Sequence, residues 1–244
     1  MRLIVVIPAR YRSSRLPGKP LIDIMGETLV RRTYLQCIKA IAPELVYVAT
    51  DDERIKAHCD ANGMNVIMTS PDCATGTDRV AEVAQQIEAD LYINVQGDEP
   101  IFNPDDITAV IEAAREFPGQ ILNGYCPIED EALFRSPTIP KVVLRPDGRL
   151  LYMSRNGVPS TKTFAFVRSW RQICIYAFPP DALRAFSATP TKTPLEQLED
   201  IEILRFLELG YEVRMVPMSS HSIAVDTPED VDRVLAVLRN QTQY

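Results

Sequence analysis

The sequence has few of the residues that carry nucleophilic or redox chemistry. It contains two histidines, His58 and His221, and five cysteines, none of which forms a C-x-x-C pair. The cysteines are Cys37, Cys59, Cys73, Cys126 and Cys174. Because they are odd in number and widely spaced, they predict free thiols in a reducing cytosol rather than a zinc or redox centre. No Ser/His/Asp or Cys/His set is evident, which disfavours hydrolysis through an enzyme nucleophile.

Long apolar runs and a surplus of basic residues are also absent. No apolar run approaches the roughly 20 residues that a membrane helix needs, and the run Leu3–Ile7 is too short for the core of a signal peptide. We therefore expect a cytoplasmic protein without membrane insertion. Acidic side chains outnumber basic ones by 33 to 26, a formal net charge of −7. Because general nucleic-acid binding needs a surplus of Lys and Arg, nucleic acid is not an expected partner. The composition does not exclude a local anion-binding site.

The chain does contain a regular alternation of strands and helices. Apolar runs predict buried strands at Leu3–Ile7, Leu45–Thr50, Val66–Met68 and Leu91–Val95. Helical segments are expected at Leu29–Ala40, Asp52–Asn62, Val80–Ile87 and Asp105–Phe117. This order predicts the α/β class, with an open, mostly parallel sheet and right-handed crossovers. A length of 244 residues allows one such domain with an insertion.

The alternation of strands and helices is interrupted between about residues 125 and 190. Short β-like runs separated by Pro and Gly occur at Lys141–Leu144, Leu150–Met153 and Gln172–Phe178. They predict an inserted antiparallel β layer within a single domain that spans residues 1–244. The α/β alternation then returns with a helix at Leu195–Leu209, strands at Tyr211–Pro217 and Ile223–Val225, and a last helix from Thr227.

The most unusual segment of this acidic chain is the loop after the first strand. From Arg10 to Lys19 it contains four cationic side chains and no acid. Such a loop lies at the carboxyl edge of an open α/β sheet, where ligands bind, and its cations and free N–H groups suit a polyphosphate. It is not a Walker A loop, because Ser13 stands where the first glycine should be and Pro20 follows Lys19. The segment therefore predicts a different phosphate-binding design.

Two aspartates are expected near the same edge. Asp98 follows the predicted strand Leu91–Val95, and Asp226 follows the short run that ends at Val225. Mg²⁺ in proteins takes one or two carboxylates together with phosphate oxygens and waters. An Asp before Thr-Pro is also an ordinary helix start, and for Asp226 alone that interpretation stays open. The two acids and the basic loop together predict a site for phosphate and Mg²⁺.

A resemblance to a known family is carried by segments spread over the whole chain: Ile7–Pro20, Ala49–Glu53, Gly76–Arg79, Asn94–Pro100 and Val225–Asp230. These segments resemble the CMP-Kdo synthetases, the cytidylyltransferases that activate 3-deoxy-manno-octulosonate (Kdo). The resemblance implies a nucleotidyltransferase (Rossmann-like) fold and a homodimer formed through the inserted β layer. It further implies that CTP and a sugar acid react to give a CMP-sugar and pyrophosphate.

By position, the resemblance also implies roles for individual residues. Lys19, Asp98 and Asp226 are the implied catalytic residues of an in-line displacement at the α-phosphate, with Asp98 and Asp226 as magnesium ligands. No covalent enzyme intermediate is expected. The residues implied to bind the nucleotide are Arg10, Ser13, Arg15, Lys19, Thr77, Arg79 and Gln96.

The segments on the acceptor side depart from the family pattern. Where the family commonly has His-Ile-Gly-x-Tyr, this chain has Gln172-Ile173-Cys174-Ile175-Tyr176, and a usual Glu-Gln pair becomes Glu202-Ile203. The candidates for binding the acceptor are Lys141, Arg155, Tyr176, Glu196, Gln197 and Glu202. Losing an amide removes hydrogen-bond capacity from a pocket that should recognise hydroxyls.

Several alternatives therefore stay open. The acceptor is Kdo or a related acid, such as an 8-amino-Kdo, another ulosonic acid or a phosphonate. A non-catalytic nucleotide-binding protein is the alternative from another class, disfavoured because Lys19, Asp98 and Asp226 are all present.

Overall fold

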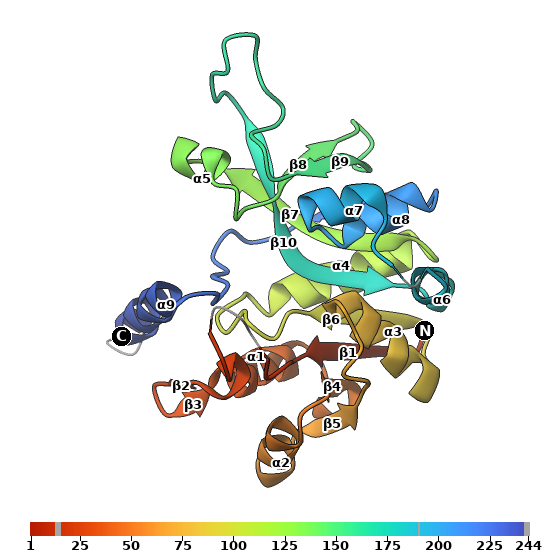
Figure 1. Ribbon diagram of the computed structural model, residues 1–244, viewed down its shortest axis with the longest axis vertical. Coiled ribbons are helices and arrows are strands. Elements are labelled where there is room, and N and C mark those ends of the chain that lie inside the picture. Colours follow the sequence, from red (N-terminus) through yellow and green to blue (C-terminus); the bar gives the residue numbers. More distant parts are fainter. Residues whose placement is uncertain (13–15, 190, 242–244) are drawn as a thin grey trace. The chain divides into compact units, whose positions relative to one another are not determined.

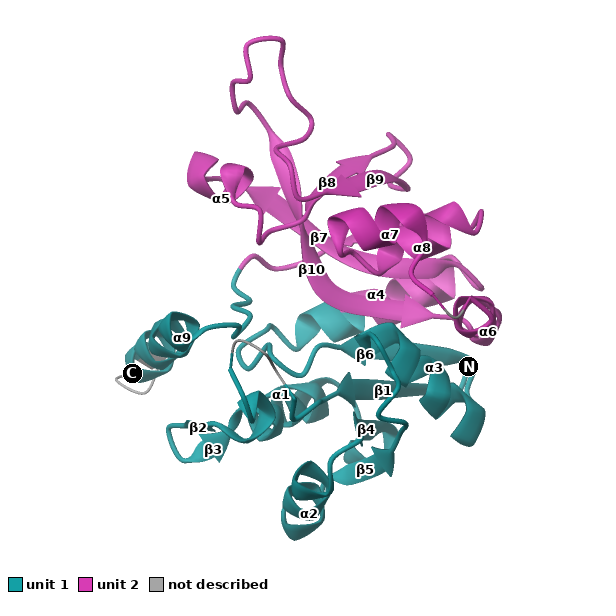
Figure 2. Cartoon of the chain, viewed as in Figure 1, with its two compact units in different colours: residues 1–108, 221–244 teal, residues 109–220 magenta. Residues whose placement is uncertain are grey.

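The structure, a computed structural model, describes residues 1–12, 16–189 and 191–241. The chain is organised as two compact units (Figure 2). Unit 1 comprises residues 1–108 and 221–244, and unit 2 comprises residues 109–220. Unit 2 thus extends on both sides beyond the stretch 125–190 in which the sequence predicts an inserted layer.

Four parallel strands form the centre of unit 1, in the order β5–β4–β1–β6. Their bounds are Leu3–Pro8 for β1, Val46–Thr50 for β4, Asn65–Met68 for β5 and Leu91–Val95 for β6. Val5 of β1 lies opposite Val46 on one side and Ile93 on the other. Burial on both faces explains why β1 is a continuous apolar run. Because all four strands are parallel, their carboxyl ends meet at one edge, which carries the Arg10 loop and Asp98.

Helices α1, α2 and α3 flank this sheet (Figure 1). They span Leu29–Ala40, Glu53–Ala61 and Gly76–Gln86. Each begins after a residue whose side chain accepts a hydrogen bond from the first turn, namely Thr28, Asp52 and Thr75. Such caps each stabilise a helix by about 1 kcal/mol. Unit 1 also contains the short helices η1 (Lys19–Leu21) and η2 (Pro43–Leu45) and the hairpin β2–β3 (Asp23–Ile24 and Glu27–Thr28).

The last helix of the chain, α9 (Pro228–Gln241), belongs to unit 1. Val225 and Val234 pack in one apolar cluster with Ile24 and Leu29, and all four are at most 1% exposed. This packing holds the segment before α9 against the start of α1, and so places Asp226.

Unit 2 mixes parallel and antiparallel pairs around β7. Strand β11 runs parallel to β7 and β10 runs antiparallel to it, while β8 pairs antiparallel with both β10 and β9. The strands span Ile121–Ile128 (β7), Lys141–Leu144 (β8), Leu150–Ser154 (β9), Ser169–Phe178 (β10) and Val213–Pro217 (β11). The helices span Glu131–Arg135 (α5), Pro180–Ser187 (α6), Pro194–Glu199 (α7) and Ile203–Glu208 (α8). Helix α4 (Asp105–Glu116) contains the point in the sequence where unit 1 gives way to unit 2.

The predicted fold class, a mostly parallel α/β sheet flanked by helices with an antiparallel β layer, is confirmed, but individual elements differ from the prediction. The expected helix Leu195–Leu209 is two helices, because Asp200 at the end of α7 adopts a left-handed backbone (φ 51°). Strand β7 was not predicted. Residues 223–225, all of them described, lie outside any strand.

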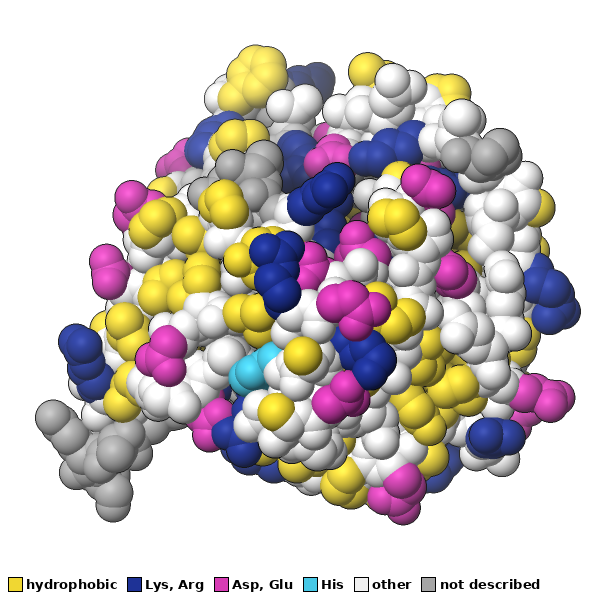
Figure 3. Space-filling view, turned by 60° about the horizontal axis from the view of Figure 1, so that its bottom comes forward, with side chains coloured by type: hydrophobic (Ala, Val, Ile, Leu, Met, Phe, Trp, Pro, Cys, Tyr) yellow, Lys and Arg dark blue, Asp and Glu magenta, His cyan; other side chains and the backbone are white. Residues whose placement is uncertain are grey.

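On the face that Figure 3 shows, acidic and basic side chains are interspersed. This agrees with a sequence that contains both kinds in similar numbers, 33 acidic and 26 basic. Among the helices in the described parts of the chain, none is both long and apolar enough to span a membrane.

Candidate functional site

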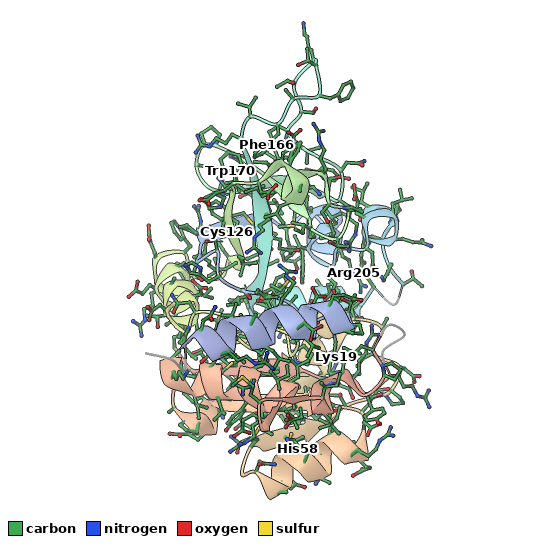
Figure 4. The ribbon with its side chains drawn as sticks, turned by 90° about the vertical axis from the view of Figure 1, so that its left-hand side faces the viewer. Lys19, His58, Cys126, Phe166, Trp170 and Arg205 are labelled. Carbon is green, nitrogen blue, oxygen red and sulfur yellow. The ribbon has the colours of Figure 1, made fainter. Side chains whose placement is uncertain are left out.

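Lys19 and the two predicted magnesium ligands meet in unit 1. The Lys19 ammonium lies 2.7 Å from Oδ2 of Asp98 and 3.2 Å from Oδ1 of Asp226. Lys19 is labelled in Figure 4, near α9. Its side chain is 15% exposed, and those of Asp98 and Asp226 are 26% and 38% exposed. Burial alone would lower the pKa of Lys19, but the two carboxylates outweigh it and the pKa is raised.

The end of β6 is shaped so that Asp98 can approach β1. A Cβ atom on Gly97 would lie 2.7 Å from the carbonyl oxygen of Pro8, so only glycine allows this close approach without a shift of the backbone. The hydroxyl of Thr33, on α1, donates to the Gly97 carbonyl at 3.3 Å. Asp98 is thereby held at the carboxyl edge by both β1 and α1.

Asp226 is tied to the same loop through the backbone. The N–H of Val225 donates to the carbonyl of Asp98 at 2.9 Å. One residue beyond Asp98, the carboxylate of Glu99 accepts a hydrogen bond from the hydroxyl of Ser222, and both side chains are buried. The sequence interpretation assigned no role to Glu99 or Ser222, although Glu99 lies inside a segment that it quoted. These contacts fix the separation of the two aspartates.

The basic loop is closed at its ends by Tyr11 and Gly18. The N–H of Gly18 donates to the Tyr11 carbonyl at 3.0 Å, and Gly18 has a positive φ of 71°. The guanidinium of Arg54, at the start of α2, lies 3.3 Å from the centre of the Tyr11 ring. Asp52 orients Arg54 through two hydrogen bonds of 2.8 and 2.6 Å. The sequence analysis assigned no role to Tyr11 or Arg54. Arg54 lies outside the basic loop in the sequence, so its contact with Tyr11 could not be expected from the sequence.

The other predicted nucleotide residues fall into two groups. Arg10 is exposed at the end of β1, and Gln96 packs against Gly76, since a Cβ atom there would lie 3.0 Å from its amide nitrogen. Thr77 and Arg79 are instead buried in the first turns of α3. Ser13 and Arg15 lie outside the described residues.

Arg79 joins α3 to the ends of β4 and β5. Its guanidinium lies 3.2 Å from Oδ1 of Asp51 and donates to the hydroxyl of Thr69. At 3% exposure it can shape the nucleotide side only by holding these elements together.

The geometry around Lys19 fits a divalent cation. Two partly exposed carboxylates already face one cationic group, the ammonium, and Mg²⁺ commonly uses one or two carboxylates with phosphate oxygens and waters. Among the described residues, no group of three or more His, Cys, Asp or Glu side chains could hold a metal. Asp98 and Asp226 are two carboxylates that could hold such a cation together with phosphate oxygens and waters.

Three of the predicted acceptor-binding residues in unit 2 already have partners within the protein. The ammonium of Lys141, at 0% exposure, donates to the carbonyls of Ser136, Ile139 and Arg155 at 2.7, 2.6 and 2.5 Å. Arg155 donates to the carbonyls of Pro137, Glu199 and Asp200.

Glu196 forms a buried ion pair. Its two oxygens accept from Arg205 at 2.5 and 2.7 Å, and both side chains are at most 2% exposed. Arg205 is labelled in Figure 4. These contacts tie Lys141, Arg155 and Glu196 into unit 2, and their assignment to the acceptor stays a prediction.

The remaining acceptor candidates are Tyr176, Gln197 and Glu202. The ring of Tyr176 stacks on Phe178 at 5.9 Å, and Phe178 stacks on Phe206 of α8 at 5.2 Å. Gln197 is exposed on α7, and Glu202 is half-buried just before α8. Tyr176 thus lies on the side of the unit 2 sheet that α8 covers.

A parallel α/β sheet whose carboxyl edge carries a lysine, two carboxylates and a basic loop is typical of the class of α/β proteins that bind nucleotides at this edge. The family model described as cytidylyltransferase matches residues 4–215. The chain is 39% identical to 3-deoxy-manno-octulosonate cytidylyltransferase of Protochlamydia amoebophila (strain UWE25), over 100% of this chain and 96% of the relative. It is 42% identical to the protein of the same name from Myxococcus xanthus (strain DK1622), over 98% and 97%.

Solved structures agree. A structure described as CMP:2-keto-3-deoxy-manno-octonic acid synthetase complexed with CTP matches with a TM-score of 0.91 and 35% identity, over 99% of this chain and 100% of that chain. A cytidylyltransferase from Leptospira borgpetersenii serovar Hardjo-bovis (strain JB197) shares the fold, with a TM-score of 0.68 and 17% identity, over 98% and 87%. The chain belongs to the cytidylyltransferase family, which confirms the resemblance inferred from the sequence.

Proposed function

We propose that the protein transfers CMP from CTP to the anomeric hydroxyl of Kdo and releases pyrophosphate. The observation that carries the proposal is the contact of Lys19 with both Asp98 and Asp226 at the carboxyl edge of the unit 1 sheet. It is supported by two relatives named 3-deoxy-manno-octulosonate cytidylyltransferase and by a similar structure that holds CTP.

The chemistry follows from the charges at this edge. Asp98 and Asp226 would hold Mg²⁺, which when bound neutralises charge on the phosphates. Lys19 and Arg10 add positive charge for the α-phosphate and for the departing pyrophosphate. The anomeric oxygen bonds to the α-phosphorus as the bond to pyrophosphate breaks, and its proton passes to solvent. Positioning of the two substrates supplies most of the acceleration, so no enzyme nucleophile is required.

The proposal extends to assembly and location. We expect a cytoplasmic homodimer formed through the inserted β layer. Its support is the exposed segment 159–168 before β10, in which Phe164 and Val167 are 72% and 76% exposed. Exposed apolar side chains gathered on one segment are typical of an interaction surface. Light scattering of the purified protein tests the assembly.

The activity is tested by measuring pyrophosphate release from CTP with a panel of acids, with and without Mg²⁺. The panel contains Kdo, 8-amino-Kdo, another ulosonic acid and a phosphonate. We expect Mg²⁺-dependent release with Kdo. Release only with another acid would mean that this acid, and not Kdo, is the acceptor. No release with any acid would favour a non-catalytic nucleotide-binding protein.

A further inference from the structure

Strand β10 contains a bulge directly before Tyr176. In the antiparallel ladder with β7, Ile173 pairs with Gly124 and the next pair is Tyr176 with Asn123. Strand β10 therefore advances three residues while β7 advances one, so the register of the ladder shifts between Ile173 and Tyr176. Bulges bend a strand and re-aim the side chains that follow, and they are common beside active sites.

One buried side chain holds both ends of this bulge. The amide nitrogen of Asn123, at 0% exposure, donates to the carbonyls of Ile173 and Ile175 at 2.9 and 3.0 Å. Both hydrogens of this amide are thus donated to backbone carbonyls of the bulge. A buried network whose members are all satisfied favours a single geometry.

Gln172 completes the network. Its amide nitrogen donates to the side-chain oxygen of Asn123 at 2.9 Å, and Gln172 is 7% exposed. This donor fixes which way the Asn123 amide faces, because with oxygen toward Gln172 its nitrogen must face the two carbonyls. Gln172 is also the position where the sequence departs from the His of the family pattern.

The residue that follows the bulge is the acceptor candidate Tyr176. Tyr176 lies directly opposite Asn123, so the two side chains project from the same face of the sheet. Its ring is held on that face by stacking on Phe178, which stacks on Phe206 of α8. A slip of one residue in β10 would turn Tyr176 to the opposite face.

We infer that Asn123 and Gln172 are positioning residues of the acceptor site, which fix the β10 bulge and thereby aim Tyr176 at the sugar acid. This inference rests on the proposed function, since Tyr176 has a substrate to meet only if the protein binds a sugar acid. Neither residue needs to touch the acceptor. Their effect passes through the backbone of residues 173–175.

The test replaces Gln172 with Met, which keeps the length of the side chain and removes its amide. We expect Gln172→Met to raise the KM for Kdo about tenfold, with the KM for CTP changed less than about twofold. Gln172→His, which can donate to Asn123, should restore most of the affinity. The matched control is Gln120→Met, which removes a hydrogen bond of 3.0 Å to Arg214 in the same unit and should leave both KM values unchanged.

A double variant separates positioning from direct contact. If Gln172 acts through Tyr176, then Gln172→Met combined with Tyr176→Phe should raise the KM for Kdo no further than Tyr176→Phe alone. The inference would be overturned if the increases in the KM for Kdo of the two single variants multiplied in the double variant. Equal changes in the KM for Kdo and the KM for CTP after Gln172→Met would overturn it as well.

A crystal structure of Gln172→Met gives a readout that does not depend on activity. We expect a rotated Asn123 amide and a displaced Tyr176 ring, and an unmoved bulge and ring would overturn the inference. A wild-type protein that turns over no acid would instead contradict the proposed function, and the crystal structure would still decide whether Gln172 positions Tyr176.

Discussion

The two units place a lysine in opposite electrostatic surroundings. In unit 1, Lys19 lies between two carboxylates, which raise its pKa despite burial. In unit 2, Lys141 is buried against backbone carbonyls, and this burial, with a contribution from Arg155, lowers its pKa to about 8. The lysine of unit 1 thus lies between two partly exposed carboxylates, whereas that of unit 2 is buried among backbone carbonyls.

The largest effect is expected from Asp98→Asn, which tests the unit 1 side of this comparison. The variant removes a negative charge from the proposed magnesium site, and we expect turnover to fall by about 10²- to 10³-fold, as when a charge-stabilising group is lost from an active site. Pyrophosphate release measures turnover, and thermal unfolding checks the fold. The control is Asp72→Asn, an exposed aspartate of the same unit. Retained activity would mean that Asp98 is not a magnesium ligand.

The second largest effect is expected from Arg205→Met, which tests the unit 2 side. The variant leaves the carboxylate of Glu196 buried without its partner, and breaking such a pair costs about 3–5 kcal/mol of unfolding free energy. Urea denaturation measures this loss. Turnover per folded molecule should change little, because the pair serves the structure.

The control for this variant is Arg184→Met, which removes an exposed ion pair with Asp181. It should have no measurable effect on stability. A stable Arg205→Met protein with a raised KM for Kdo would show that the Glu196–Arg205 pair belongs to the acceptor site, and the contrast between the units would fail.

The pH dependence of stability gives a third test, of comparable size. The unfolded chain keeps the Lys141 proton up to about pH 10.5, whereas the folded protein releases it near pH 8. The unfolded state therefore holds more protons between these values, and the free energy of unfolding rises with pH there. A pKa lowered from 10.5 to about 8 corresponds to a rise of about 3 kcal/mol in the free energy of unfolding.

The measurement is urea denaturation at intervals from pH 7.5 to pH 10. We expect Lys141→Met to show less of this rise than the wild type, while Lys162→Met, which changes an exposed lysine, keeps it. Parallel curves for Lys141→Met and the wild type would mean that Lys141 does not titrate in this range.

The unit 1 site could be predicted because its signals are local. A residue directly after a buried parallel strand must lie at the carboxyl edge, so Arg10 and Asp98 were placed by the position of β1 and β6 alone. Asp226 was harder, since it follows no strand. Its place depends on the packing of Val225 with Ile24 and Leu29, which are far away in the sequence.

The unit 2 roles could not be predicted, because they depend on partners that the sequence does not pair. In a continuous helix, Glu196 and Arg205 would be nine residues and about 13 Å apart along the axis. The break at Asp200 brings their side chains together. Strand β7 was missed for a related reason, since Asn123, Gly124 and Pro127 interrupt its apolar pattern and only the bulge of β10 gives Asn123 a function.

The smallest effect is expected from Arg54→Met, which asks how firmly the basic loop must be held. Arg54 stacks on Tyr11 at 3.3 Å, and Tyr11 in turn closes the loop onto Gly18. An exposed cation–π contact contributes about 0.5–1 kcal/mol, so we expect the KM for CTP to rise about two- to fivefold with kcat and the KM for Kdo unchanged. The control is Lys56→Met, which removes another exposed ion pair from the same helix. Equal effects of the two variants would show that Tyr11 is held without Arg54. An effect of Arg54→Met on the KM for Kdo would mean that the loop also serves the acceptor, and the division of labour between the units would then be less sharp than their lysines suggest.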